Sequence, residues 1–181
     1  MTSCTLSGVK WTTLLLCIFS LFVLACSRST NTGAPGSNGG SEGRRISSTD
    51  VVKVNAERVT ITRGDSVDAP VRLRIDNGFH VNANPPSYSY LKATEIEVKP
   101  EGGLSVAYIT YPDPQMRKFP FAEQPLAVYE GETSIKLRLK ADQNSSLGQK
   151  NLSGKLRIQA CDDQVCYAPG TMDVTIPLEV K

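Results

Sequence analysis

Apolar and polar residues alternate along most of the chain after residue 50. The alternation is clearest in five segments, at residues 71–76, 95–99, 135–140, 155–160 and 171–180. Two further apolar segments, 59–61 and 104–111, are typical of additional strands. A period of two indicates strands with one buried and one solvated face. Because no segment here shows a convincing helical period, the pattern predicts an all-β domain.

Glycine, proline and asparagine residues separate these segments. Several short strands divided by turn residues favour an antiparallel β-sandwich, and the immunoglobulin-like class fits best. We expect one such domain over residues 51–181, which is long enough to bury a core of its own.

The first 25 residues have the composition of a secretory signal peptide. A short start with one positive charge precedes an apolar segment that is too short to span a membrane comfortably. This segment ends in VLACS at residues 23–27, which resembles the lipobox of bacterial lipoproteins. The resemblance implies cleavage before Cys26 and attachment of a diacylglyceryl group to its thiol. An ordinary cleaved signal that leaves Cys26 as a free thiol is the alternative.

Residues 26–50 form the predicted linker, which begins at the lipidated cysteine. Its Gly, Ser, Thr and Asn residues cannot bury apolar surface, so we expect a flexible coil. The expected protein is a lipid-anchored domain of the bacterial cell envelope that faces the periplasm or the exterior, where disulfides persist. Since Cys4 and Cys17 leave with the signal peptide, the domain keeps only Cys161 and Cys166.

The charge and the ligand-type residues exclude several classes of function. A formal net charge of +2 without a basic stripe argues against a nucleic-acid partner. One histidine and two cysteines after residue 50 supply at most three soft ligands, and four residues between the cysteines is wider than the usual zinc knuckle. We therefore expect no metal site and no cofactor.

Cys161 and Cys166 occur in the segment QACDDQVCYAP at residues 159–169. Fully extended, this spacing would hold their Cα atoms roughly 17 Å apart, whereas a disulfide needs about 4.4–6.8 Å. The chain must therefore turn at Asp162–Asp163 if the two are bonded. In the alternating pattern, Cys161 has the parity of the polar residues 155, 157 and 159, so we expect an accessible sulfur. The residues alone leave open whether the pair is a structural clip or a redox centre.

Several segments together are similar to the N-terminal domain of the bacterial thiol:disulfide interchange protein DsbD. They are GFHVNANPPS at 78–87, YP at 111–112, Phe121 followed by VYEG at 128–131, and the cysteine segment at 159–169. The resemblance covers residues 51–181 and implies an immunoglobulin-like sandwich with a redox-active cysteine pair. It implies that Cys161 and Cys166 are that pair and that Phe119 and Phe121 belong to a cap loop that shields it.

The resemblance also implies partners. Domains of this family receive electrons from a membrane-embedded domain and reduce thioredoxin-fold proteins in the periplasm. No transmembrane or thioredoxin domain follows in this sequence, so the expected electron donor is a separate membrane protein. The chain would then be a protein-disulfide oxidoreductase of the electron-carrier type. The alternative is a tethered, non-catalytic binding module with a structural disulfide.

The charge of two aspartates and the position of one histidine bear on the redox interpretation. Asp162 and Asp163 lie between the cysteines, and their charge disfavours nearby thiolates, which fits a reductant better than an oxidant. His80 is the sole histidine. It is either a polar side chain at a strand end or a neighbour of the cysteines that assists proton transfer.

Overall fold

The computed structural model describes residues 46–181. The predicted signal peptide, Cys26 and most of the predicted linker lie outside the described residues. The described part is built from strands joined by turns, which confirms the all-β, immunoglobulin-like prediction. Within residues 46–181 there is no helix with the length and apolarity needed to cross a membrane.

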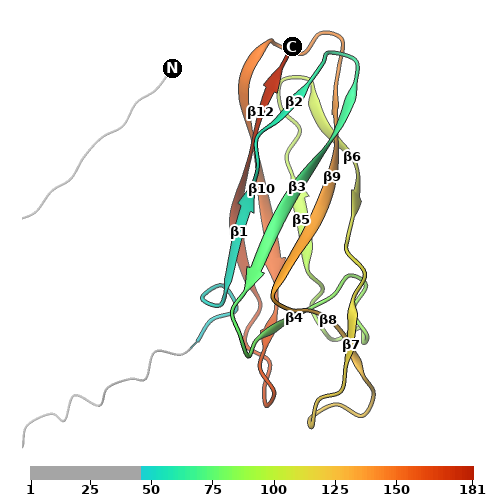
Figure 1. Ribbon diagram of the computed structural model, residues 1–181, viewed down its shortest axis with the longest axis vertical. Coiled ribbons are helices and arrows are strands. Elements are labelled where there is room, and N and C mark those ends of the chain that lie inside the picture. Colours follow the sequence, from blue (N-terminus) through green and yellow to red (C-terminus); the bar gives the residue numbers. More distant parts are fainter. Residues whose placement is uncertain (1–45) are drawn as a thin grey trace, which may run out of the picture. The chain divides into compact units, whose positions relative to one another are not determined.

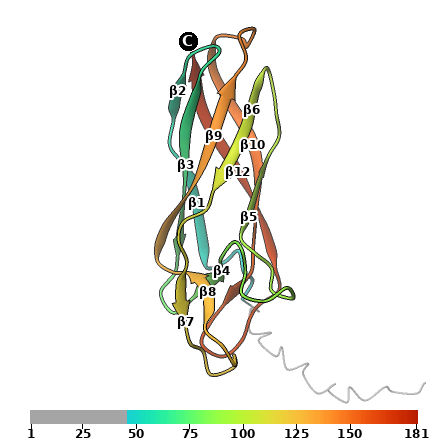
Figure 2. The same ribbon diagram turned by 90° about the vertical axis from the view of Figure 1, so that its right-hand side faces the viewer.

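Two four-stranded sheets form the sandwich (Figures 1 and 2). The first has the order β1 (Val52–Ala56), β3 (Ser66–Ile75), β9 (Glu132–Ala141) and β6 (Leu104–Thr110). The second has the order β2 (Val59–Ile61), β12 (Gly170–Val180), β10 (Gly148–Ile158) and β5 (Glu95–Val98). Neighbouring strands are antiparallel except for β2 and β12, which pair in parallel.

The core is made of the alternating apolar residues that the sequence pattern indicated. Buried side chains from both sheets meet in one cluster, and they include Val71, Leu73, Leu137, Leu139, Leu156, Ile158, Ile176 and Leu178. Charged residues such as Arg72, Arg74 and Lys155 occupy the exposed positions between them. Burial of one face per sheet explains the period of two, since apolar burial is the main favourable contribution to folding.

A third sheet of short strands lies at one end of the sandwich, opposite the C-terminus (Figures 1 and 2). Its order is β11 (Ala160–Cys161), β4 (His80–Asn82), β8 (Leu126–Tyr129) and β7 (Gln115–Arg117). The sequence pattern did not predict these strands, because they have only two to four residues. In β4 and β8, moreover, every residue is buried, so no alternation is visible. This sheet carries Cys161 and His80.

Candidate functional site

Cys161 and Cys166 form a disulfide between directly opposed residues of a short hairpin. Their Cα atoms are 3.9 Å apart and their sulfurs are 2.02 Å apart. Two backbone hydrogen bonds flank the pair, from Asp162 N to Val165 O at 3.0 Å and from Tyr167 N to Ala160 O at 2.8 Å. The cysteines therefore occupy a non-hydrogen-bonded position, where opposed side chains approach each other most closely. The chain turns over residues 162–165, as a bonded pair at this spacing requires.

The side chain of Asp162 holds this turn. Its Oδ1 accepts hydrogen bonds from Gln164 N and Val165 N, both at 2.8 Å. Its Oδ2 accepts a third from the hydroxyl of Tyr167 at 2.5 Å. The Tyr167 hydrogen bond, followed by the two backbone donors, lowers the pKa of Asp162. Asp162 is therefore an anion at neutral pH and part of the hairpin, whereas Asp163 is exposed.

Ser48 and Gln159 brace the base of the hairpin. The buried Ser48 Oγ accepts a hydrogen bond from Ala160 N at 2.9 Å and donates one to Ala168 O at 2.6 Å. Gln159 Nε2 donates to Tyr167 O at 3.2 Å. Both arms of the hairpin are thus fixed. Because Ser48 makes two of these contacts, the contacts of the domain begin before residue 51, the expected domain start.

The prediction that Cys161 faces outward is wrong. Its exposed fraction is 0 %, whereas Cys166 is partly exposed. The parity fails because β10 ends at Ile158 and the chain then changes sheet. After Gln159 it pairs with β4 in the third sheet, where consecutive residues Ala160 and Cys161 are both buried. The alternation of β10 therefore carries no information about the cysteine that follows it.

His80 is the cross-strand neighbour of Cys161 in the β4–β11 pair. It is also the first residue of β4. His80 therefore lies both at a strand end and beside a cysteine, the two positions that the sequence suggested for it. The residue is 2 % exposed, and its Nε2 has no hydrogen-bond partner among residues 46–181. Burial lowers the pKa of His80 from 6.5 to about 4, against the opposing effect of Asp163 and Asp162. The imidazole is therefore neutral at physiological pH.

The two phenylalanines of the expected cap loop have different environments. Phe119 is 4 % exposed and packs with Leu126 and Val128, whereas Phe121 is 42 % exposed. The rings of His80 and Phe119 stack with centroids 4.1 Å apart, and those of Phe119 and Phe121 stack at 5.4 Å. An aromatic column, which we define as His80, Phe119 and Phe121, thus leads from the neighbour of Cys161 to the surface.

Lys118 closes the loop that carries the two phenylalanines. Its Nζ donates to the carbonyl oxygens of Ala122, at 2.6 Å, and Glu123. A backbone hydrogen bond of 3.1 Å from Ala122 N to Phe119 O closes the same loop. The loop is therefore held in a defined conformation with Phe119 directed inward.

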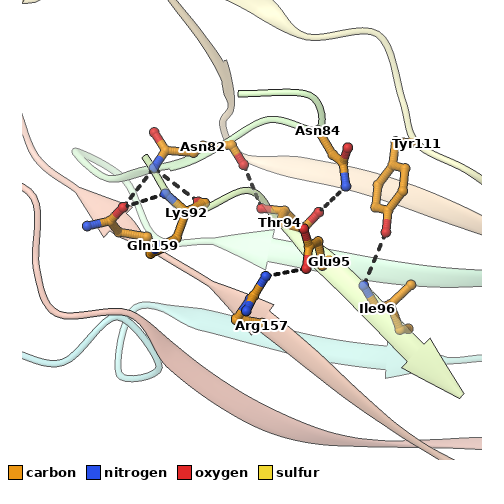
Figure 3. Close-up of polar contacts among 9 residues, drawn as sticks. All are labelled: Asn82, Asn84, Lys92, Thr94, Glu95, Ile96, Tyr111, Arg157 and Gln159. Carbon is orange, nitrogen blue, oxygen red and sulfur yellow. Dashed lines mark hydrogen bonds and ion pairs between the residues drawn. The ribbon is translucent and has the colours of Figure 1, made fainter. Parts of the chain in front are cut away.

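Sequence reasoning missed the role of the asparagines in the segment 78–87. Asn82 is fully buried, and its Nδ2 donates to Lys92 O at 3.2 Å and to Gln159 Oε1 at 3.1 Å (Figure 3). Lys92 N donates to the same Gln159 oxygen at 3.0 Å. Asn84 Nδ2 donates to Thr94 O at 3.0 Å. The bonds of Asn82 and Lys92 tie the 83–94 loop to Gln159, which precedes β11. The one signal in the sequence was the position of Asn82 between the apolar residues Val81 and Ala83.

A pocket of about 420 Å³ adjoins the disulfide hairpin at Asp163. Its lining includes His80, Gln115, Arg117, Glu130 and Asp163. Arg117 Nε and Glu130 Oε1 form an ion pair at 3.2 Å. The surroundings of the disulfide therefore combine acidic groups on the hairpin with a paired cation on β7.

The sequence model described as "Thiol:disulfide interchange protein DsbD, N-terminal" matches residues 48–177. The match includes the two cysteines, His80 and both phenylalanines of the cap loop. No curated protein sequence matches the chain.

Among solved structures, the N-terminal periplasmic domain of ScsB from Proteus mirabilis is similar. It has 20 % identity and a TM-score of 0.50, and the alignment covers 72 % of this chain and 47 % of that one. The chain thus spans about half the length of that structure, and at this identity the likeness concerns the fold. A chain of a type I cohesin–dockerin complex from Clostridium thermocellum aligns with 12 % identity and a TM-score of 0.40, over 72 % of this chain and 99 % of that one. That score supports no conclusion about this chain.

The family match covers most of the chain and agrees with the resemblance carried by the cysteine segment and by the segment 78–87. The chain therefore belongs to the family of the N-terminal domain of the thiol:disulfide interchange protein DsbD.

Proposed function

We propose that this domain is a thiol–disulfide exchange module of the cell envelope that passes electrons to thioredoxin-fold proteins. The observation that carries the proposal is the Cys161–Cys166 disulfide, which joins directly opposed residues at one end of the domain. On the loop-entropy estimate, closing so short a loop stabilises the fold by only about 2 kcal/mol. A bond that contributes little to folding and joins two residues of one hairpin is suited to repeated opening and closing.

The exchange would proceed through a mixed disulfide. In the reduced domain, the thiolate of Cys166 attacks one sulfur of the partner disulfide, and a partner thiolate leaves and takes a proton. The thiolate of Cys161 then attacks the Cys166 sulfur, which releases the second partner thiol and restores the Cys161–Cys166 bond. Two electrons and two protons pass to the partner. A separate membrane electron donor with a dithiol would return two electrons by the reverse sequence.

The assignment of the two sulfurs rests on burial. Cys166 is partly exposed, whereas Cys161 is fully buried beside β4. A partner sulfur must approach in line with the attacking sulfur, so the more accessible cysteine makes the mixed disulfide. Cys161 is then the resolving cysteine.

We assign an assisting role to His80 in the second step. Its neutral imidazole lies across the strand pair from Cys161, and its Nε2 has no hydrogen-bond partner among the described residues. Such a group can take the proton of the Cys161 thiol during attack. The thiolate formed beside it would raise the low pKa of the imidazole, because an opposite charge favours the protonated ring. Phe119, stacked on His80, would act as the cap that excludes stray thiols from the pair.

Membrane attachment is a separate part of the proposal. The sequence before residue 27 supports a signal peptide and a diacylated Cys26, and the family of the domain fits an envelope location. Mass spectrometry of protein extracted from membranes should show a diacylglyceryl adduct on Cys26. A soluble protein with an unmodified Cys26 would refute the anchor and leave the exchange reaction untouched.

Trapping experiments test the exchange reaction. The Cys161→Ala variant keeps the accessible Cys166 and should accumulate a mixed disulfide with thioredoxin-fold proteins of envelope extracts. The Cys166→Ala variant should trap far less, and the double variant should trap nothing. Absence of a complex with either single variant, together with resistance of the native disulfide to reduced thioredoxin, would favour the structural-disulfide alternative.

A further inference from the structure

The hairpin around the cysteines is held by contacts that involve neither sulfur. The Asp162 carboxylate accepts two hydrogen bonds from turn amides and one from the Tyr167 hydroxyl. It therefore connects the residue after Cys161 to the residue after Cys166. The Tyr167 ring also packs against Phe79, with centroids 6.0 Å apart.

None of these contacts involves a sulfur atom, so they can also form when the disulfide is open. Backbone hydrogen bonds from Asp162 N to Val165 O and from Tyr167 N to Ala160 O flank the cysteine pair on both sides. In the reduced domain, the same contacts favour the conformation in which the two thiols face each other across the hairpin.

We propose that Asp162 and Tyr167 are positioning residues that hold the reduced hairpin closed and thereby make the Cys161–Cys166 dithiol a stronger reductant. The inference rests on the proposed function of the same pair. Forming a disulfide from two thiols requires that the loop between them be closed, and part of the conformational entropy of closure is lost in doing so. Where hydrogen bonds have already closed the loop, oxidation loses less entropy, and the equilibrium moves toward the disulfide.

Thermodynamic reciprocity gives the sign. If the disulfide stabilises the closed hairpin, the Asp162–Tyr167 hydrogen bond and the disulfide stabilise the same conformation, and each favours the other. Loss of the hydrogen bond should therefore lower the equilibrium constant for oxidation. The domain would then become a weaker reductant.

The charge of Asp162 acts on the same equilibrium by a second route, because a carboxylate near the sulfurs disfavours thiolates. The choice of variant separates this charge effect from hairpin closure. Tyr167→Phe removes one hydrogen bond while it keeps both the ring against Phe79 and the charge of Asp162. A change in the oxidation equilibrium of this variant therefore reports hairpin closure and not the loss of a charge.

The test measures the oxidation equilibrium of Cys161 and Cys166 in the purified full-length protein in dithiothreitol redox buffers at pH 7, by alkylation and mass spectrometry of the peptide that contains both cysteines. A charge-assisted hydrogen bond at a partly exposed site predicts a decrease of about fivefold in the equilibrium constant for Tyr167→Phe. Asp162→Ala removes all three bonds and should decrease it further. Asp162→Asn keeps an acceptor for the turn amides and should lie between wild type and Asp162→Ala.

Tyr111→Phe is the matched control. The Tyr111 hydroxyl accepts a hydrogen bond from Ile96 N at 3.2 Å, which joins β5 to the segment after β6 rather than to the hairpin (Figure 3). This variant loses a tyrosine hydrogen bond and should keep the wild-type equilibrium constant.

Values for Tyr167→Phe and Asp162→Ala within twofold of wild type would overturn the inference, and so would an equal shift in Tyr111→Phe. Either result leaves the proposed function standing, because the wild-type pair still exchanges. A wild-type disulfide that does not equilibrate with dithiothreitol while the domain stays folded would instead refute the proposed function.

Discussion

Replacing Phe119 by alanine should expose the disulfide to small thiols. Phe119 is 4 % exposed, stacks on His80 and belongs to a small cluster with Leu126 and Val128. Truncation of a buried phenylalanine typically lowers the free energy of unfolding by about 3–5 kcal/mol. The cluster lies at the end of the domain, so we expect the lower part of this range, and we expect much of the loss to appear as easier local opening of the loop.

The expected rates follow from that free energy. If reduction requires the loop to open, a loss of about 3 kcal/mol in the closed state speeds reduction roughly 100-fold, since about 1.4 kcal/mol corresponds to tenfold. Phe121 is 42 % exposed, so Phe121→Ala should lose only about 1 kcal/mol and accelerate reduction roughly fivefold. The sequence analysis assigned both phenylalanines to the cap loop, whereas their burial predicts a larger increase in reduction rate for Phe119→Ala than for Phe121→Ala.

The assay follows reduction by dithiothreitol under native conditions, with alkylation of the released thiols and detection of the mass shift. Tryptophan fluorescence cannot be used, because the single tryptophan, Trp11, lies in the predicted signal peptide. Leu139→Ala is the control, since it removes a fully buried side chain of β9 and lowers stability without touching the cap loop. A folded Phe119→Ala domain that is reduced at the wild-type rate would refute the shielding role of Phe119. Equal acceleration by Leu139→Ala would do the same.

Four further changes have defined outcomes. Burial lowers the pKa of His80 to about 4, so the unfolded chain binds a proton that the folded domain does not between that value and 6.5. The free energy of unfolding should therefore fall by at most about 3 kcal/mol on acidification through this window. Urea titrations at pH 7 and pH 4.5 should show a smaller difference in unfolding free energy for His80→Gln than for the wild type. Replacing both Cys161 and Cys166 by alanine should lower stability by only about 2 kcal/mol, and a non-cooperative melt of that variant would contradict the estimate. Ser48→Ala leaves the buried Ala160 N without its acceptor and should lower stability by about 1–3 kcal/mol, whereas deletion of residues 27–45 should leave the melting temperature unchanged.

The long strands could be predicted from the sequence because burial of one face imposes a visible pattern. In β3, β9, β10 and β12, the apolar residues of the alternation are buried, apart from the half-buried Met172. The cysteine segment and the segment 78–87 also indicated the family, which the match over residues 48–177 confirms. Both kinds of signal are local in sequence.

The hydrophobic pattern could not predict the arrangement of the site, because that arrangement depends on contacts between distant segments. His80 and Cys161 become neighbours only through the pairing of β4 with β11. Cys161 is buried because the chain changes sheet after Ile158, an event that leaves no mark in the alternation of β10. Asn82, Gln159 and Ser48 are ordinary polar residues in the sequence, and only the fold shows that their side chains bond the hairpin or the loop beside it.

The positions of the chain ends in the domain affect how it can be attached to other molecules. The described chain begins next to the cysteine hairpin, where Ser48 bonds both of its arms, while Lys181 lies at the far end of the sandwich (Figure 1). The eleven residues of β12 place that end about 35 Å from the third sheet. A fluorescent protein or an affinity tag at the C-terminus would leave the disulfide end open, whereas a bulky fusion just before residue 46 would crowd it. A domain coupled to a sensor surface through Lys181 would therefore present its disulfide to the solution, which is the orientation that partner screening needs.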